Sequence, residues 1–176
     1  MQGNVLPERN VSWGPQRALA RLLSGLEAGV LGGIVMLALL VSGSLLRGDP
    51  WWMTSNLLGS TFYGTAALNA GPGRATVAGS ALHIFMTGSI GAGFGILFGG
   101  IQQRRRLVLL GTLAGLIWHG LADALLWRKL NPLIPMYSAQ PATLFSHALF
   151  GACLGYLGRK LPVAEKQVTE QWNGLE

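Results

Sequence analysis

Four long apolar segments constrain the fold of this chain more than any other feature of its sequence. They cover residues 24–46, 77–101, 107–127 and 142–158. Each is close to the roughly 20 residues that an α-helix needs to cross about 30 Å of hydrocarbon. Charged residues make up only 11% of the chain, against roughly 25% in soluble domains. The sequence therefore predicts an all-α integral membrane protein, with a single transmembrane domain over residues 1–176 built as a four-helix bundle.

The basic residues indicate how these helices are oriented. Cytoplasmic loops of membrane proteins carry an excess of Lys and Arg. With both termini inside, most basic residues lie on the cytoplasmic side, namely Arg9, Arg17, Arg21, Arg104, Arg105, Arg106, Arg159, Lys160 and Lys166. The other side then holds Arg47, Arg74, Arg128 and Lys129. We expect a multi-pass protein of the bacterial cytoplasmic membrane with cytoplasmic termini.

The net charge of +6 is explained by this topology and does not indicate a nucleic-acid partner. The run Arg104, Arg105 and Arg106 forms a basic face for the anionic headgroups of the lipid bilayer. Trp51 and Trp52 begin a long connection on the opposite side, where tryptophan rings commonly lie at the interface. We expect an interfacial helix over residues 51–68, polar tails at 1–20 and 162–176, and a proline-rich, non-helical loop at 131–141.

Glycines recur at four-residue spacing in every predicted helix. The set comprises Gly25, Gly29, Gly33, Gly91, Gly95, Gly99, Gly111, Gly115, Gly151 and Gly155. Lipid offers little hydrophobic drive for helix association, so close backbone approach through small residues is a main source of packing. We expect these faces to pack against each other, against other membrane subunits or against a second copy of the chain. The similar order of glycines and histidines in the two halves also suggests two tandem helical hairpins.

All three histidines extend these glycine series. His83 precedes Gly91 by two four-residue steps, His119 follows Gly115, and His147 precedes Gly151. Asp123 continues the series after His119. Helix geometry places these four side chains in one layer of the membrane, and ionisable groups inside a bilayer usually face a bundle interior or a water-filled cavity.

Two interpretations of this layer stay open. In one, neutral histidines form hydrogen bonds between helices, to partners such as Thr87, Ser146 or Asp123, and fix the helix register. In the other, His83, His119, Asp123 and His147 hold a transition metal, or two of the histidines hold haem b as axial ligands. Loss of a bound metal or haem on substitution of His119 would favour the second interpretation.

Glu27 is the other charged residue within an apolar segment. Its carboxylate is expected either to pair with a nearby arginine such as Arg21, or to carry a proton or cation. The sequence contains no nucleophile with a partnering base, no P-loop and no dinucleotide-binding fingerprint. We therefore expect no enzymatic activity.

The stretch GLIWHGLADALLWRKLNPLIPMYSAQPATLFSHALFGACLGYLGR forms the last third of the apolar sequence. It resembles small bacterial four-span membrane proteins of unknown function, through Asn131, Pro132, His147, Gly151 and Gly155. In those proteins a helix ends in an LNP-like turn, and the next helix begins with a histidine followed by glycines. The resemblance implies the four-span fold and implies no activity.

Together these patterns predict a non-catalytic membrane subunit or accessory protein that packs through its glycine faces within a larger membrane complex. One alternative is a haem- or metal-binding membrane anchor in electron transfer, which uses the three histidines and Asp123. A second alternative is a small proton-coupled transporter, in which Glu27 and the histidine layer form the proton path. Copurification with a larger complex, metal content and ion flux distinguish these hypotheses.

Overall fold

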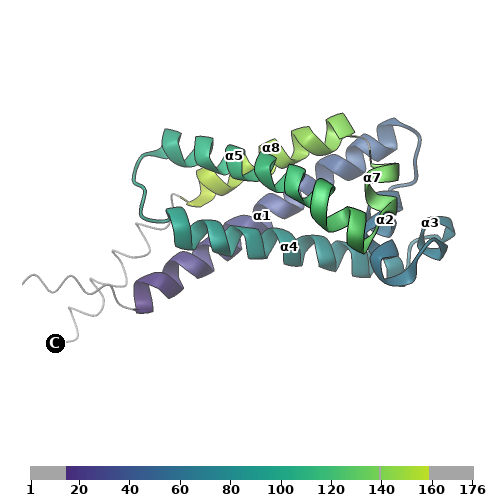
Figure 1. The fold of residues 1–176 in the computed structure, drawn as a ribbon, viewed down its shortest axis with the longest axis horizontal. Helices are drawn as coiled ribbons and strands as arrows, with labels where there is room; N and C mark the ends of the chain where they lie inside the picture. Colours follow the sequence, from purple (N-terminus) through teal and green to yellow (C-terminus); the bar gives the residue numbers. More distant parts are fainter. Residues whose placement is uncertain (1–14, 139, 159–176) are drawn as a thin grey trace, which may run out of the picture.

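The computed structural model describes residues 15–138 and 140–158, and this part of the chain is helical without strands (Figure 1). The elements are α1 (Pro15–Leu46), α2 (Met53–Tyr63), α3 (Ala66–Asn69), α4 (Arg74–Phe98), α5 (Arg104–Leu121), the π-helix η1 (Ala122–Trp127), α6 (Arg128–Leu130), α7 (Leu133–Tyr137) and α8 (Gln140–Leu157). Residues 15–20, expected in a polar tail, are the first turns of α1. The rest of that tail and the tail at 162–176 lie outside the described residues.

Three of the described helices are long and apolar enough to cross a membrane. They are the segments Arg17–Leu46, Arg74–Phe98 and Arg104–Leu130. The expected membrane helices at 24–46, 77–101 and 107–127 are thus confirmed as candidate spans, and an integral membrane protein is supported. The fourth expected span corresponds to α8, which has 18 residues and is not among the three. Its crossing of the membrane stays a prediction.

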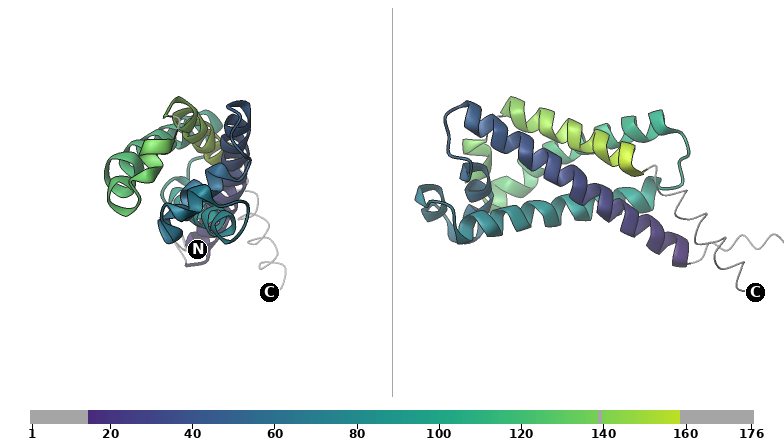
Figure 2. Two further views of the ribbon diagram at one scale, coloured as in Figure 1. Left: turned by 90° about the vertical axis from the view of Figure 1, so that its right-hand side faces the viewer. Right: turned by 180° about the vertical axis from the view of Figure 1, so that it is seen from behind.

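The long helices pack as two pairs. α1 packs along α4, α5 packs along α8, and α1 also packs on α8, whereas α4 and α5 do not run packed along each other. Figure 2 shows the two pairs from the end and from behind. Where the pairs meet, a core of buried side chains joins all four long helices: Ala28, Met36, Phe94, Leu107, Phe150 and Leu154. This core occupies the half of the molecule nearer Arg104.

Glycines form the seam between α1 and α4. A Cβ added to Gly25 or Gly29 would fall within 3.0 Å of backbone atoms of α4, at Gly91 and Gly95 or at Thr87 and Gly91. The backbone of α1 is therefore in direct contact with the backbone of α4 along this seam. The absence of a side chain at these positions is what allows the approach.

The seam between α5 and α8 is built in the same way. Gly111 and Gly151 face each other, and a Cβ on Gly155 would meet the backbone at Leu107 and Val108. Gly99 differs from the other predicted packing glycines because it caps the end of α4, where the Arg21 side chain lies against it. The pairing of α1 with α4 and of α5 with α8 is the one that two tandem helical hairpins would give. The origin of these hairpins by duplication stays a prediction.

The connection between α1 and α4 is packed more deeply than the sequence predicts. The single helix expected over 51–68 is wrong, because Gly64, with a positive φ of 61°, separates α2 from α3. The backbone of α2 also contacts α4 directly, since a Cβ on Gly79 would meet the Ser55 carbonyl. Asn56 is fully buried there. Its amide nitrogen lies 3.0 Å from the Ala67 carbonyl, and its oxygen accepts a hydrogen bond from the Thr76 hydroxyl at 2.6 Å.

The chain after α5 also departs from expectation. The third long helix continues to Leu130, with a π-helical segment at Ala122–Trp127. The 131–141 segment is not wholly non-helical, because α7 forms a short helix at Leu133–Tyr137. Asn131, buried between these parts, donates to the Ser60 hydroxyl at 2.8 Å and so ties the segment to α2.

Candidate functional site

A cavity of about 490 Å³ lies between the two helix pairs, on the side of the core away from Arg104. Met36, Ile90 and Phe150 of its wall are also core residues or pack on the core. Apolar side chains from α1, α2, α4, α7 and α8 form most of the wall, and Trp118 and Trp127 contribute from α5 and η1. Sites for small molecules in proteins commonly measure about 300–1,000 Å³ and combine apolar walls with a few polar groups.

His83 is one of the polar groups in the wall. It lies on α4, it is 7% exposed, and its Nε2 is 2.9 Å from the Gly33 carbonyl oxygen of α1. Because a carbonyl oxygen can only accept, Nε2 is the protonated ring nitrogen and donates. The next turn of α4 also lies against Gly33, since a Cβ added there would meet the Thr87 hydroxyl and lie 2.8 Å from the Thr87 Cβ. The glycine seam therefore brings His83 within reach of the α1 backbone.

His147 lines the cavity from the opposite pair. Its Nδ1 lies 2.8 Å from the Thr143 carbonyl one turn earlier in α8. By the same argument Nδ1 carries the proton and donates. The ring of His119, on α5, packs against the ring of His147, with centroids 4.8 Å apart and planes tilted by 50°.

The structure thus brings part of the predicted histidine layer together. His119 and His147 are in contact, and His83 and His147 line one cavity, while His119 and Asp123 are not lining residues. Asp123 lies in the first turn of the π-helix η1. π-Helical turns are frequent near functional sites, and this one continues the helix that supplies Trp118 and Trp127 to the wall.

The described residues give no support to a metal site. They contain no group of three or more His, Cys, Asp or Glu side chains that could hold a metal ion. The pair His119 and His147 also leaves no room for haem between the rings. Nitrogen ligands at about 2 Å on each side of an iron put the two nitrogens about 4 Å apart and the ring centroids about 6 Å apart, which exceeds the 4.8 Å observed.

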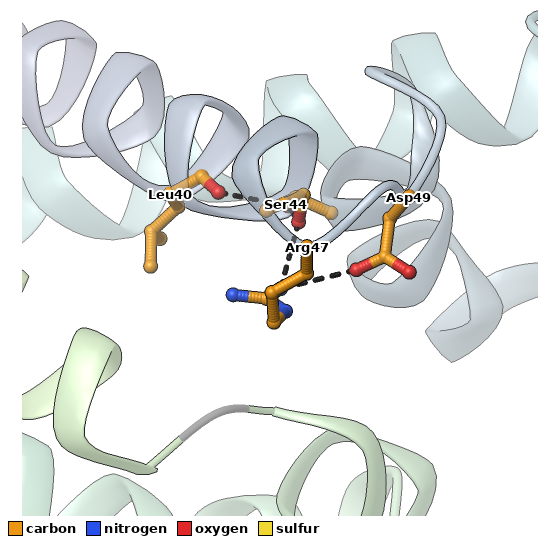
Figure 3. A network of polar contacts seen from close by, with 5 residues as sticks. Leu40, Ser44, Arg47 and Asp49 are labelled. Carbon is orange, nitrogen blue, oxygen red and sulfur yellow. Dashed lines mark hydrogen bonds and ion pairs between the residues drawn. The ribbon is translucent and has the colours of Figure 1, made fainter.

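Charged residues stand at the far end of the cavity from the core. Arg47 and Asp49 are both lining residues and form an ion pair of 3.3 Å. Arg47 also donates to the Ser44 hydroxyl at 3.1 Å, and that hydroxyl is 2.9 Å from the Thr54 hydroxyl of α2. Figure 3 shows the Arg47 side chain leaving the end of α1 beside Ser44 and Asp49 and pointing away from that helix. The ion pair forms a polar mouth for a largely apolar chamber.

Other predicted site residues lie elsewhere. Glu27 is exposed and does not line the cavity with His83 and His147, and its role as a proton or cation carrier stays a prediction. The guanidinium of Arg104 lies 3.8 Å from the ring centroid of Tyr156, while Arg105 and Arg106 are exposed. The rings of Trp51 and Trp52 pack edge to face, 5.7 Å between centroids, after the end of α1.

The cavity itself is what sequence reasoning missed. Its apolar lining residues read in the sequence as ordinary membrane-helix residues, and the Arg47 and Asp49 pair reads as a short polar turn. One signal is present in the sequence, because the glycine series predict His83 and His147 as interior groups. Comparison of the chain with protein-family models, with curated proteins and with solved structures finds no match.

Proposed function

We propose that this chain is a non-catalytic, multi-pass membrane protein that binds a small, mostly apolar ligand in the cavity between its two helix pairs. The observation that carries the proposal is the cavity of about 490 Å³ with the Arg47 and Asp49 mouth at one end and two imidazoles in its walls. Burial of apolar ligand surface supplies binding free energy, and the few polar groups orient the ligand.

The composition of the wall supports an adaptable binding site. Met36, Met53 and Met86 all line the cavity, and the unbranched, polarisable methionine side chain can change shape to fit different partners. Trp118 and Trp127 line the cavity and add flat aromatic surface and indole N–H donors. In the orientation expected from the basic residues, and with α8 as a fourth crossing, the mouth at Arg47 faces the outer side of the membrane.

Membership of a larger complex remains part of the proposal but needs another surface. The glycine faces of α1 with α4, and of α5 with α8, lie against each other within this chain. A partner subunit would therefore contact side chains of the lipid-facing surface. Extraction of the protein from native membranes in mild detergent, followed by identification of copurifying proteins, tests this part separately.

Native mass spectrometry of the detergent-purified protein tests ligand binding. We expect an adduct of a small molecule that is lost in the variant Leu40→Trp, because Leu40 lines the cavity and the indole would fill part of it. The matched control is Leu31→Trp on the same helix, at a side chain that is 43% exposed. An adduct that survives Leu40→Trp as well as Leu31→Trp would refute the proposed site.

A further inference from the structure

The hydrogen bonds of the two cavity histidines determine which chemistry they offer to a ligand. His83 donates through Nε2 to the Gly33 carbonyl, and His147 donates through Nδ1 to the Thr143 carbonyl. A neutral imidazole carries one ring proton, and its other nitrogen is an acceptor. His83 therefore offers Nδ1, and His147 offers Nε2, each as a lone pair.

Neither of these lone pairs is used by the part of the chain that the structure describes. Within residues 15–138 and 140–158, Nδ1 of His83 and Nε2 of His147 have no hydrogen-bond partner. The carboxylate among the lining residues belongs to Asp49, which is paired with Arg47 at the mouth. No carboxylate of the cavity wall is therefore left to stabilise the charged imidazolium form of His83 or His147.

Position along α1 separates His83 from that ion pair. His83 bonds to the carbonyl of Gly33, and Gly33 lies 14 residues before Arg47 in the sequence. Nearly all of these residues belong to α1, and a rise of 1.5 Å per residue places the two positions about 20 Å apart. Between these two ends the walls are mostly apolar, with side chains such as Leu40 and Met86. A ligand that reaches the imidazoles must therefore carry its polar group into an apolar chamber.

The geometry points to a neutral ligand of the alcohol or phenol class, whose hydroxyl donates a hydrogen bond to Nδ1 of His83 or Nε2 of His147. This inference rests on the proposed function, because it assumes that the cavity is a binding site. A hydroxyl matches the site because it supplies the donor that both ring nitrogens lack, and it brings no charge into the apolar chamber. An ether or a ketone of the same shape offers acceptors alone and leaves both lone pairs unmatched.

Two probes that differ only in this donor test the inference. 4-Hexylphenol and 4-hexylanisole share ring and chain, and they differ by a hydroxyl against a methoxy group. Binding to the protein in lipid nanodiscs is measured by calorimetry, and the signal of Leu40→Trp nanodiscs is subtracted to remove partition into lipid. We expect the phenol to bind at least about fivefold more tightly, the ratio that one net hydrogen bond provides.

Variants that keep the structural hydrogen bond and move the free acceptor away from the position of the ring nitrogen identify the acceptor. The amide nitrogen of Gln resembles Nε2 in position, and that of Asn resembles Nδ1. His83→Gln and His147→Asn therefore keep the donors to Gly33 and Thr143. We expect the double variant to lose most of the preference for the phenol, because the remaining amide oxygens do not occupy the positions of Nδ1 of His83 and Nε2 of His147. A preserved fivefold preference would overturn the assignment to these imidazoles.

Nitrogen-15 NMR of histidine in the unsubstituted protein gives a second readout that does not depend on variants. We expect His83 as the Nε2–H tautomer and His147 as the Nδ1–H tautomer, and the opposite tautomers would overturn the inference. Equal binding of both probes to the unsubstituted protein would also overturn it and would leave the cavity as a binding site. Absence of binding by both probes, together with absence of any native adduct, would overturn the proposed function as well.

Discussion

The seam between α1 and α4 gives the sharpest quantitative test of the fold. Gly91 lies in α4 where the two backbones meet. A Cβ at this position would lie 2.5 Å from the Cα and 2.7 Å from the backbone nitrogen of Gly29. Carbon atoms pack best at about 3.5–4.0 Å, so Gly91→Ala must separate the helices by roughly 1 Å. No side chain can rotate away to relieve the contact, because all the atoms involved belong to the main chain.

The matched control is Gly93→Ala in the same helix, since a Cβ at Gly93 meets nothing within 4 Å. Both changes add one methyl group and both replace Gly by Ala in a helix, which favours the helix by about 1 kcal/mol. Comparing the two variants cancels that contribution. Overpacking typically costs about 1–3 kcal/mol, so we expect Gly91→Ala to be less stable than Gly93→Ala by about 2 kcal/mol.

Equilibrium unfolding in mixed micelles of mild detergent and SDS measures this difference. The two variants are compared with the unsubstituted protein under one set of conditions, and the SDS fraction at the midpoint is converted to a free energy of unfolding. Equal free energies for Gly91→Ala and Gly93→Ala would refute the close approach of α1 and α4.

Three further predictions concern stability. Gly115→Ala in the α5 and α8 seam should lower the free energy of unfolding by about 1–3 kcal/mol relative to Gly120→Ala, where an added Cβ meets nothing within 4 Å; equal values in SDS titration would contradict that seam. Asn56→Ala should cost about 2–3 kcal/mol because it removes a fully buried side chain that bonds several backbone carbonyls; an unchanged thermal midpoint would contradict the burial. His83→Gln keeps a donor for the Gly33 carbonyl, whereas the shorter side chain of His83→Asn does not place its amide nitrogen at the position of Nε2. The free energy of unfolding of His83→Gln should therefore be higher than that of His83→Asn by about 1 kcal/mol; the reverse order would contradict the assigned hydrogen bond.

The sequence predicted the parts of this fold that follow from local spacing. Four-residue glycine periodicity in a segment such as 24–46 places small residues on one helix face, and in lipid that face packs closely. The positions of Gly25, Gly91, Gly111 and Gly151 at the seams follow this rule. Pattern and helix geometry were enough because each seam needs only two regular helices.

The parts that were missed depend on how elements sit in three dimensions. The cavity lies between helix pairs in which α4 and α5 do not pack along each other, and no periodicity in either helix encodes their separation. The expectation of one helix over 51–68 failed because Gly64 interrupts it with a positive φ. The close contact of α2 with α4 at Gly59 and Gly79 depends on the tertiary packing of a segment that holds no four-residue glycine repeat. The π-helix at Ala122–Trp127 likewise has no signature in the apolar pattern.

The two backbone seams have a mechanical consequence. A seam without side chains has no rotamers to exchange, so each pair, α1 with α4 and α5 with α8, must move as a stiff plate. The plates meet where α1 packs on α8, at contacts such as Gly32 against the Phe150 ring. Since α4 and α5 do not run packed along each other, the angle between the plates sets the width of the chamber, and the hydrogen bond from Asn131 to Ser60 limits how far that angle can open.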